Sequence, residues 1–416
     1  MISFEKFQLD NGLKVIVHQD KYTPIVAVNL LYNVGARDEH PEKTGFAHLF
    51  EHLMFGGSVN IPNYDEALQL VGGENNAFTS NDITNYYLTL PKNNIETGFW
   101  LEADRMLSLA FTEKSLEVQR NVVIEEFKQR YLNQPYGDVW LLLRPLAYQL
   151  HPYRWNTIGK EIAHIEKASM EDVKAFFKQF YSPNNAILVV AGDVETDEIK
   201  HLSEKWFGSL PRGPEIKKEL PEEPPQMAPQ NLTVERDVPF DAIYKAYHMY
   251  ARTDKEYHTV DLISDIFSGG HSSRFYKELV KNKKMFSEIT AYVSGDIDKG
   301  LFIISGKLIK GILMEDAEQA IQEEIDKLTK EIIAVEELSK VKNRVEATLE
   351  FSVMSVLNKA MSLAYSELLG DAELINREVE NYLNVSTKDI KEQANVIFRK
   401  NNCSTLYYLA KNKALN

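Results

Sequence analysis

Two stretches that lie 217 residues apart carry the same pattern, and this internal duplication is the feature that most constrains the fold. The first reads MEDVKAFFKQFYSPNNAILVV and the second reads TKDIKEQANVIFRKNNCSTLYY. At this offset Asp172 matches Asp389, and the pair Asn184-Asn185 matches Asn401-Asn402. Each stretch has the periodicity of an amphipathic helix followed by a polar turn and a strand. We therefore expect two halves of one kind.

A segment rich in proline and charge, LPRGPEIKKELPEEPPQMAPQ, lies near the middle of the chain. This composition is typical of an extended, exposed linker. With 416 residues the chain is too long for one ordinary core, so two domains are expected. The predicted division is an N-terminal domain at 1–212, a linker at 213–230 and a homologous C-terminal domain at 231–416.

Predicted strands and helices are mixed in both halves, which indicates an α+β class. NNAFTSNDITNYYLTLP reads as two adjacent strands joined by a tight turn. We predict two homologous domains, each a largely antiparallel sheet flanked by helices, facing each other across a cleft. Strands are expected at about 12–18, 25–34, 74–80, 83–90, 185–191, 242–250, 286–294, 299–307 and 403–409. First-half helices are expected at about 44–55, 63–71, 92–109, 113–132, 135–149 and 169–180, and second-half helices between 313 and 399.

Composition excludes several classes of protein. The net charge of −14 argues against a general nucleic-acid binder, and the single cysteine, Cys403, excludes a disulfide framework. No apolar run approaches the ~20 residues of a membrane span, and the opening MISFEKFQLDNG has no signal-peptide pattern. We expect a soluble protein, cytoplasmic as written, or periplasmic if a signal peptide has been removed.

Within GFAHLFEHLMFGG, residues 45–57, His48, Glu51 and His52 stand at positions i, i+3 and i+4 of a predicted helix. This spacing places the three side chains on one face. Thr44 is the predicted N-cap, and Gly56-Gly57 is the predicted end. The order H-x-x-E-H reverses the H-E-x-x-H of other zinc peptidases.

Two neutral imidazoles and one carboxylate suit zinc, with a fourth position left open for water. Zinc lowers the pKa of a bound water, and Glu51 could take its proton as a general base. Histidines four residues apart also occur on ordinary amphipathic helices. A metal site therefore needs a third ligand from another element.

The best candidate for that ligand lies in EVQRNVVIEEFKQR. Glu126 lies one turn beyond Val122 and Val123, on the inward, apolar side of the predicted helix. Glu125 lies on a polar side before Lys128. An inward carboxylate is costly unless it is paired or bound to metal, so Glu126 is the predicted ligand. The alternative is a partly exposed carboxylate near the helix end.

Taken together, HLFEH, GGENNAFTSNDITNYY, WLEADRM and RNVVIEE resemble the pitrilysin-type zinc peptidases. This inverzincin family includes the mitochondrial processing peptidase and insulin-degrading enzyme. The resemblance covers essentially the whole chain and is strongest to the short-chain branch, whose members pair as dimers. It implies that His48, His52 and Glu126 bind one zinc ion per chain, with Glu51 as the general base.

The resemblance also implies a substrate-binding strand, to whose edge an extended peptide adds by main-chain hydrogen bonds. The matching residues are Asn75, Asn76, Ala77, Phe78 and Thr79. Without the resemblance, this segment reads as a turn and an ordinary edge strand.

The chain departs from the family pattern in both halves. The family often has a glutamate seven residues before the third ligand as outer support, and here that residue is Gln119. In the C-terminal domain the family's substrate-holding arginine and tyrosine are replaced by Val280 and Ser287. Paired family enzymes divide the site between subunits. We therefore expect a related partner chain that supplies this pair, with a homodimer as the alternative.

The sequence thus predicts a zinc metalloendopeptidase that hydrolyses extended or unfolded peptides as the zinc subunit of a heterodimer. A maturation peptidase dedicated to one small peptide is a second enzymatic interpretation. The competing class is a non-catalytic scaffold or partner subunit of the same family. Such relatives typically lose part of the ligand set, whereas all four positions are filled here.

Overall fold

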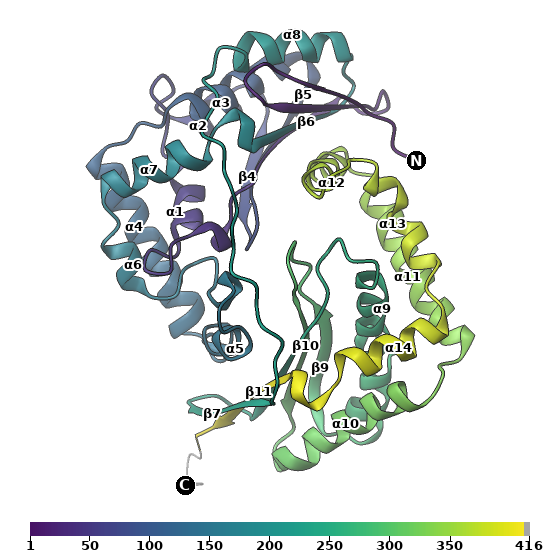
Figure 1. Ribbon diagram of the computed structural model, residues 1–416. Helices are drawn as coiled ribbons and strands as arrows, with labels where there is room; N and C mark the ends of the chain where they lie inside the picture. The colour runs from purple at the N-terminus through teal and green to yellow at the C-terminus, as the bar shows by residue number, and fades with distance from the viewer. Residues whose placement is uncertain (412–416) are drawn as a thin grey trace. The chain divides into compact units, whose positions relative to one another are not determined.

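The computed structural model describes residues 1–411, and their contacts group into two units (Figure 1). Unit 1 comprises Met1–Gln129, Trp155–Pro221 and Glu350–Arg377. Unit 2 comprises Arg130–Arg154, Glu222–Leu349 and the chain from Glu378 onward. Each unit is defined by its contacts and contains segments from both halves of the chain. The predicted domain boundaries, which divide the chain in sequence order, stay a prediction.

Unit 1 is built on a six-stranded sheet among the described residues. Strands β2 and β6 are parallel, and the other neighbouring strands are antiparallel. The central strands are apolar on both faces, as a sheet covered by helices requires. In spatial order the strands are β1 (Glu5–Gln8), β2 (Lys14–Gln19), β6 (Ala186–Gly192), β3 (Ile25–Tyr32), β5 (Thr84–Pro91) and β4 (Glu74–Thr79).

Helices cover both faces of this sheet. α12 packs on the face formed by Ala27, Leu31 and Val189, whereas Gly98 of α3 lies against Val28 and Leu88 of the other face. The helices of unit 1 are α1 (Phe46–Leu53), α2 (Tyr64–Gln69), α3 (Ile95–Leu107), α4 (Glu113–Phe127), α6 (Ile162–Glu166), α7 (Met170–Phe180), α8 (Thr196–Phe207) and α12 (Val356–Leu368).

Unit 2 repeats the topology with a five-stranded sheet among the described residues. Its order is β7 (Gln230–Arg236), β11 (Cys403–Ala410), β8 (Ala242–His248), β10 (Leu301–Leu308) and β9 (Phe286–Val293). β7 and β11 are parallel and the rest are antiparallel, which matches β2, β6, β3, β5 and β4 of unit 1 strand for strand. The shared order supports the predicted duplication and confirms the α+β class with a largely antiparallel sheet in each half.

The helices of unit 2 also lie on both faces of its sheet. α5 covers one face, where Leu143 contacts the cluster around Tyr244 and Ile303. α9, α10 and α14 lie with the other face, in the cluster that contains Phe267 and Phe302. The bounds are α5 (Val139–Ala147), α9 (Tyr257–Ser268), α10 (Met314–Lys330) and α14 (Thr387–Ile397).

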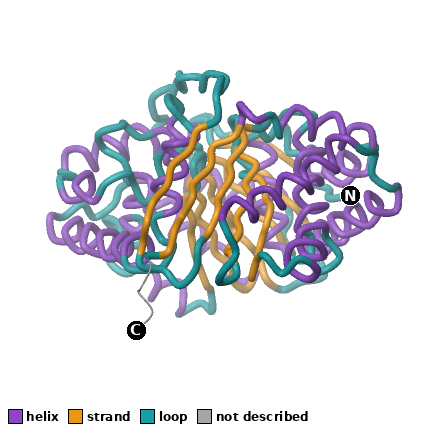
Figure 2. Tube along the Cα trace, turned by 90° about the horizontal axis from the view of Figure 1, so that it is seen from below, coloured by secondary structure: helices purple, strands orange, loops and turns teal. Residues whose placement is uncertain are grey.

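The remaining elements are shorter or span the boundary of the units. α11 (Val335–Ser352) and α13 (Leu374–Leu383) each cross from one unit to the other. Two short π-helical segments are η3 (Lys128–Leu132) and η6 (Tyr276–Asn282). Figure 2 shows helices flanking the orange strands. In residues 1–411, no helix is both long and apolar enough to cross a membrane.

The predicted linker at 213–230 has little regular structure and is mostly exposed, but several of its residues bind other parts of the chain, among them Lys218 and Glu223. Lys218 is largely buried and binds Asp38 of unit 1, with 2.9 Å between Nζ and Oδ2. The Glu223 carboxylate accepts hydrogen bonds from the backbone N–H groups of residues 149–151 in unit 2, at 2.7–2.9 Å. The expectation of an exposed segment was therefore wrong at these two charged residues, because each finds buried or backbone partners.

Candidate metal centre

The predicted histidine helix is α1, and its two faces differ as expected. Phe46, Leu49, Phe50 and Leu53 are buried in unit 1. The other face carries the two histidines and Glu51, which are only half-buried. The apolar residues fix how the helix lies, and the polar side chains stay partly exposed.

The start of α1 differs from the prediction, which assigned the N-cap to Thr44. Gly45 occupies that position with φ 90°, a backbone conformation that favours glycine. The Glu39 carboxylate accepts the N–H groups of Gly45 and Ala47, each at 2.8 Å. Thr44 instead accepts a hydrogen bond from the N–H of Lys160. Burial raises the pKa of Glu39 well above its usual value, although its two N–H partners act in the opposite direction.

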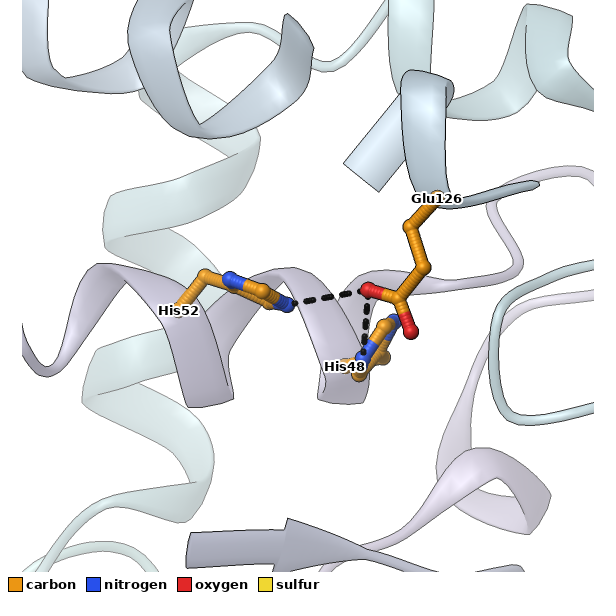
Figure 3. Close-up of side chains that lie close together, drawn as sticks. All are labelled: His48, His52 and Glu126. Carbon is orange, nitrogen blue, oxygen red and sulfur yellow. Dashed lines mark ion pairs between the residues drawn. The ribbon is translucent and has the colours of Figure 1, made fainter. Parts of the chain in front are cut away.

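Three side chains that could hold one metal ion meet on α1 and α4, and we call them the metal triad: His48, His52 and Glu126 (Figure 3). Oε2 of Glu126 lies 3.6 Å from Nε2 of His48 and 3.4 Å from Nε2 of His52. The candidate ligand atoms all lie within 4.8 Å of one another. Two donors bound at about 2.0–2.1 Å to a tetrahedral zinc ion are roughly 3.3–3.4 Å apart. The two nitrogen–oxygen distances are close to this spacing, so the triad fits one ion.

The two neighbouring glutamates of α4 have different surroundings. Glu126 is half-buried and turns toward the histidines, as Figure 3 shows. The Glu125 side chain is 61% exposed and pairs with Lys128 at 2.7 Å. Only Glu126 is placed to join the histidines, because adjacent residues of a helix point in different directions.

Glu51 lies on α1 beside the triad and contacts the edge strand of the sheet. The Thr79 hydroxyl donates to Oε2 of Glu51 at 2.6 Å. Thr79 ends strand β4, which pairs with β5 on one side and forms an edge of the described sheet. The structure thus brings Glu51 next to the predicted substrate strand.

The five predicted substrate-binding residues all lie on β4. Asn75 donates to Asp65 at 2.8 Å, and the Ala77 N–H bonds the side-chain oxygen of Asn76 at 2.8 Å. Phe78 is 40% exposed on the strand.

The remaining predicted positions lie farther along the chain. Gln119 is half-buried on α4, two helical turns before Glu126. Val280 is on η6 of unit 2, and Ser287 is on β9, where its hydroxyl bonds the Lys307 carbonyl at 3.2 Å. The roles predicted for Gln119, Val280 and Ser287 stay predictions.

Sequence reasoning missed two features around α1. One is the cap by Glu39, and the other is a buried pair, Glu102 and Arg105, on α3. The pair stands at i and i+3 inside WLEADRM, on a helix that also carries Glu96 and the buried Asp104. Opposite charges three residues apart on the inward face of a helix are a signal that could have identified the pair.

The repeated sheets and the histidine-bearing helix define a two-unit α+β chain of the kind seen in solved peptidase structures. Residues 14–154 match the model of the insulinase family, peptidase family M16, and residues 167–345 match that of the peptidase M16 inactive domain. The chain belongs to peptidase family M16.

Individual relatives agree with this assignment. The zinc protease PqqE of Helicobacter pylori is 30% identical over 409 residues, covering 97% of this chain and 92% of the relative. The crystal structure of a Helicobacter pylori protease superposes with a TM-score of 0.92 at 29% identity, covering 98% of this chain and all of that one. A probable mitochondrial-processing peptidase subunit beta of Arabidopsis thaliana is 23% identical, covering 82% of this chain and 66% of the relative.

Proposed function

We propose that this chain is a zinc-dependent endopeptidase that hydrolyses peptide bonds in extended or unfolded peptides. The observation that carries the proposal is the convergence of the metal triad beside Glu51. The names of zinc protease relatives support the same chemistry.

His48, His52 and Glu126 would hold the metal. Two imidazoles and one carboxylate are the ligand set of catalytic zinc sites, which keep one position open. When bound, zinc supplies a Lewis acid that makes a water more acidic and a carbonyl more electrophilic. The remaining steps fall to side chains of this chain.

Glu51 would act as the general base and then as the general acid. Its carboxylate would take a proton from the attacking water and deliver it to the leaving amine when the peptide bond breaks. The Thr79 hydroxyl, donating to Oε2 of Glu51, would hold the carboxylate in one orientation.

Strand β4 would bind the substrate by strand addition. It is an edge strand of the described sheet, paired with β5 on one side, so its outer edge is where a further strand would add. Pairing of this kind requires an extended peptide and depends little on its side chains. Unfolded or short peptides are therefore the proposed substrates.

A related partner chain would complete the enzyme. Val280 and Ser287 stand where family enzymes carry an arginine and a tyrosine, and neither can donate the same hydrogen bonds to a substrate carbonyl. The subunit name of the Arabidopsis relative agrees with a divided enzyme. The second candidate function is a scaffold subunit, for which the label of the C-terminal family model, an inactive domain, is the supporting observation.

The decisive experiment measures zinc content and peptidase activity of the purified chain, alone and with related sister chains. We expect one zinc per chain, weak activity alone and a gain with a sister chain. Glu51→Gln should retain zinc and lose activity by about 10²- to 10⁴-fold, because general base catalysis contributes that much.

Two adjacent glutamates provide the matched control for the metal ligand. Glu126→Gln should lose zinc, whereas Glu125→Gln, which alters an exposed residue one position away, should keep it. Absence of zinc from the wild-type chain in zinc-replete buffer would contradict the proposed peptidase activity and favour the scaffold function. Full activity of the chain alone would contradict only the need for a partner.

A further inference from the structure

A buried ion pair on α3 lies close to the candidate site without belonging to it. The Arg105 side chain is 2% exposed and that of Glu102 is 1% exposed. The guanidinium makes two charge-assisted hydrogen bonds to the carboxylate, from Nε at 2.8 Å and from Nη2 at 2.6 Å. The Tyr64 hydroxyl also donates to Oε1 of Glu102, at 2.7 Å.

Three aromatic rings surround the guanidinium, and we call this group the arginine cage: Arg105, Glu102, Tyr64, Tyr86 and Phe55. The guanidinium carbon lies 4.4 Å from the ring centre of Tyr86, 4.8 Å from that of Tyr64 and 5.7 Å from that of Phe55. These distances are within the range of cation–π contacts. Burial by itself lowers the pKa of Arg105, but the charge of Glu102 and the nearby tyrosines offset this and raise the pKa overall.

Stability alone is a weak explanation for such a pair. A buried ion pair carries a desolvation cost that packed apolar residues of similar volume do not, so it is often replaceable without loss of stability. A planar guanidinium fixes the positions of its partners, because its N–H donors point in set directions and its two flat faces contact the rings beside it. The cage therefore specifies where its rings lie.

Those rings belong to the elements that carry the candidate base and the edge strand. Phe55 lies one helical turn after Glu51, just beyond the end of α1. Tyr86 is on β5, directly opposite Ala77 of β4. The Tyr86 hydroxyl also donates to the carbonyl of Phe50 in α1, at 3.4 Å. The cage thus contacts α1 on one side and the β4–β5 hairpin on the other.

We propose that Arg105 is a positioning residue that fixes α1 against the β4–β5 hairpin and so sets how Glu51 meets Thr79 and the metal triad. This inference rests on the proposed peptidase function for its activity readout. Arg105 acts through Phe55 and Tyr86 and does not itself touch the substrate or the metal. Its effect should appear in turnover and in the electronic environment of the metal, beyond any effect on folding.

Arg105→Lys is the test, because lysine keeps the positive charge but removes the planar fork. The variant should bind one zinc per chain and keep the wild-type circular dichroism spectrum. Its kcat should fall by about 10- to 100-fold, as small misplacements of reacting groups do. Its KM should stay within about threefold, since a group that acts only in the transition state leaves ground-state binding unchanged.

The same variant, loaded with cobalt in place of zinc, gives a readout that does not need activity. We expect its visible absorption bands to differ from those of the wild-type chain. Lys359→Met is the matched control, because it breaks a largely buried ion pair with Asp20 near α12, on the opposite face of the same sheet. That control should leave both the cobalt spectrum and kcat unchanged.

Wild-type values of kcat and cobalt spectrum in folded Arg105→Lys would overturn the inference. If that variant does not fold, Tyr64→Phe removes only the hydroxyl bonded to Glu102 and should shift the same two readouts in the same direction. An unchanged Tyr64→Phe would then overturn it. A wild-type chain that stays inactive even with its sister chains would contradict the proposed function, and the cobalt spectrum would still decide the role of Arg105.

Discussion

At the scale of single residues, the candidate base is held by the strand proposed to bind peptide. Thr79 donates to Glu51 at 2.6 Å, and both residues are half-buried. Hydrogen bonds to charged groups are shorter and stronger than those between neutral groups. The contact therefore ties the orientation of the base to the position of β4.

Thr79→Val should lower kcat about tenfold or more, because a hydrogen bond to a charged group contributes on the order of 1.5–3 kcal/mol. Thr79→Ser keeps the hydroxyl and should retain most of the activity. Steady-state kinetics on zinc-loaded protein, with an unfolded peptide as substrate, would measure both. Equal kcat values for the two variants would show that the hydroxyl has no role.

At the scale of elements, α1 depends on its surroundings. It has eight residues, and isolated helices shorter than about 12–15 residues are marginal in water. Phe50 packs against Phe176 and Tyr181, with ring centres 5.0 and 5.1 Å from its own. The N-terminus, where N–H groups lack partners within the helix, is closed by Glu39.

Glu39→Gln should lower the free energy of unfolding by about 1–3 kcal/mol. The two oxygens of Glu39 each accept one N–H, whereas glutamine has one oxygen and places an amino group against the second donor. Urea unfolding followed by circular dichroism measures the change. Glu42→Gln, at an exposed position nearby, is the control and should have little effect; an equal loss in both variants would refute the cap.

At the scale of the whole molecule, the two halves of the sequence exchange helices. α5 comes from the first half and packs on the sheet of unit 2, whereas α12 comes from the second half and packs on the sheet of unit 1. Each unit therefore needs chain from both halves. His248 marks one of these contacts, since its Nε2 donates to the carbonyl of Ala147, the last residue of α5, at 2.9 Å.

This contact predicts a pH dependence of stability. Burial lowers the pKa of His248 below its ordinary value of about 6.5, although the bond to Ala147 acts in the opposite direction. Below pH ~6.5, His248 binds a proton more readily in the unfolded chain than in the folded chain, which lowers the free energy of unfolding. The stability that the neutral histidine contributes is therefore present above pH ~6.5 and is lost as pH falls toward the pKa of the folded state.

His248→Gln keeps a donor for Ala147 but cannot be protonated. Its melting temperature should therefore fall less between pH 7.5 and pH 5.5 than that of the wild-type chain. His201→Gln alters an exposed histidine on α8 and should leave the wild-type slope unchanged. If His248→Gln also shows the wild-type slope, this histidine does not set the pH response.

Local pattern was enough to predict much of the fold. The strand expected at 83–90 is β5 at Thr84–Pro91, and the helix expected at 169–180 is α7 at Met170–Phe180. Both follow from hydrophobic period and capping residues, which act over a few positions. The helix α8 was not predicted. The docking of α5 and α12 was also missed, because helical periodicity identifies an apolar face but not the sheet that covers it.

For the candidate site, the spacing of His48, Glu51 and His52 in the sequence was enough to place them on one face, because 3.6 residues per turn sets that face. The sequence also favoured Glu126 over Glu125 as lying on the inward apolar side with Val122 and Val123; Val123 is buried, but Val122 is 43% exposed, so that part of the reasoning was wrong. The approach of Glu126 to within 3.4 Å of a histidine 74 residues earlier comes from the packing of α4 on α1. The cap by Glu39 and the arginine cage were likewise decided by the tertiary structure, because such contacts depend on how distant elements pack, and no local periodicity encodes that packing.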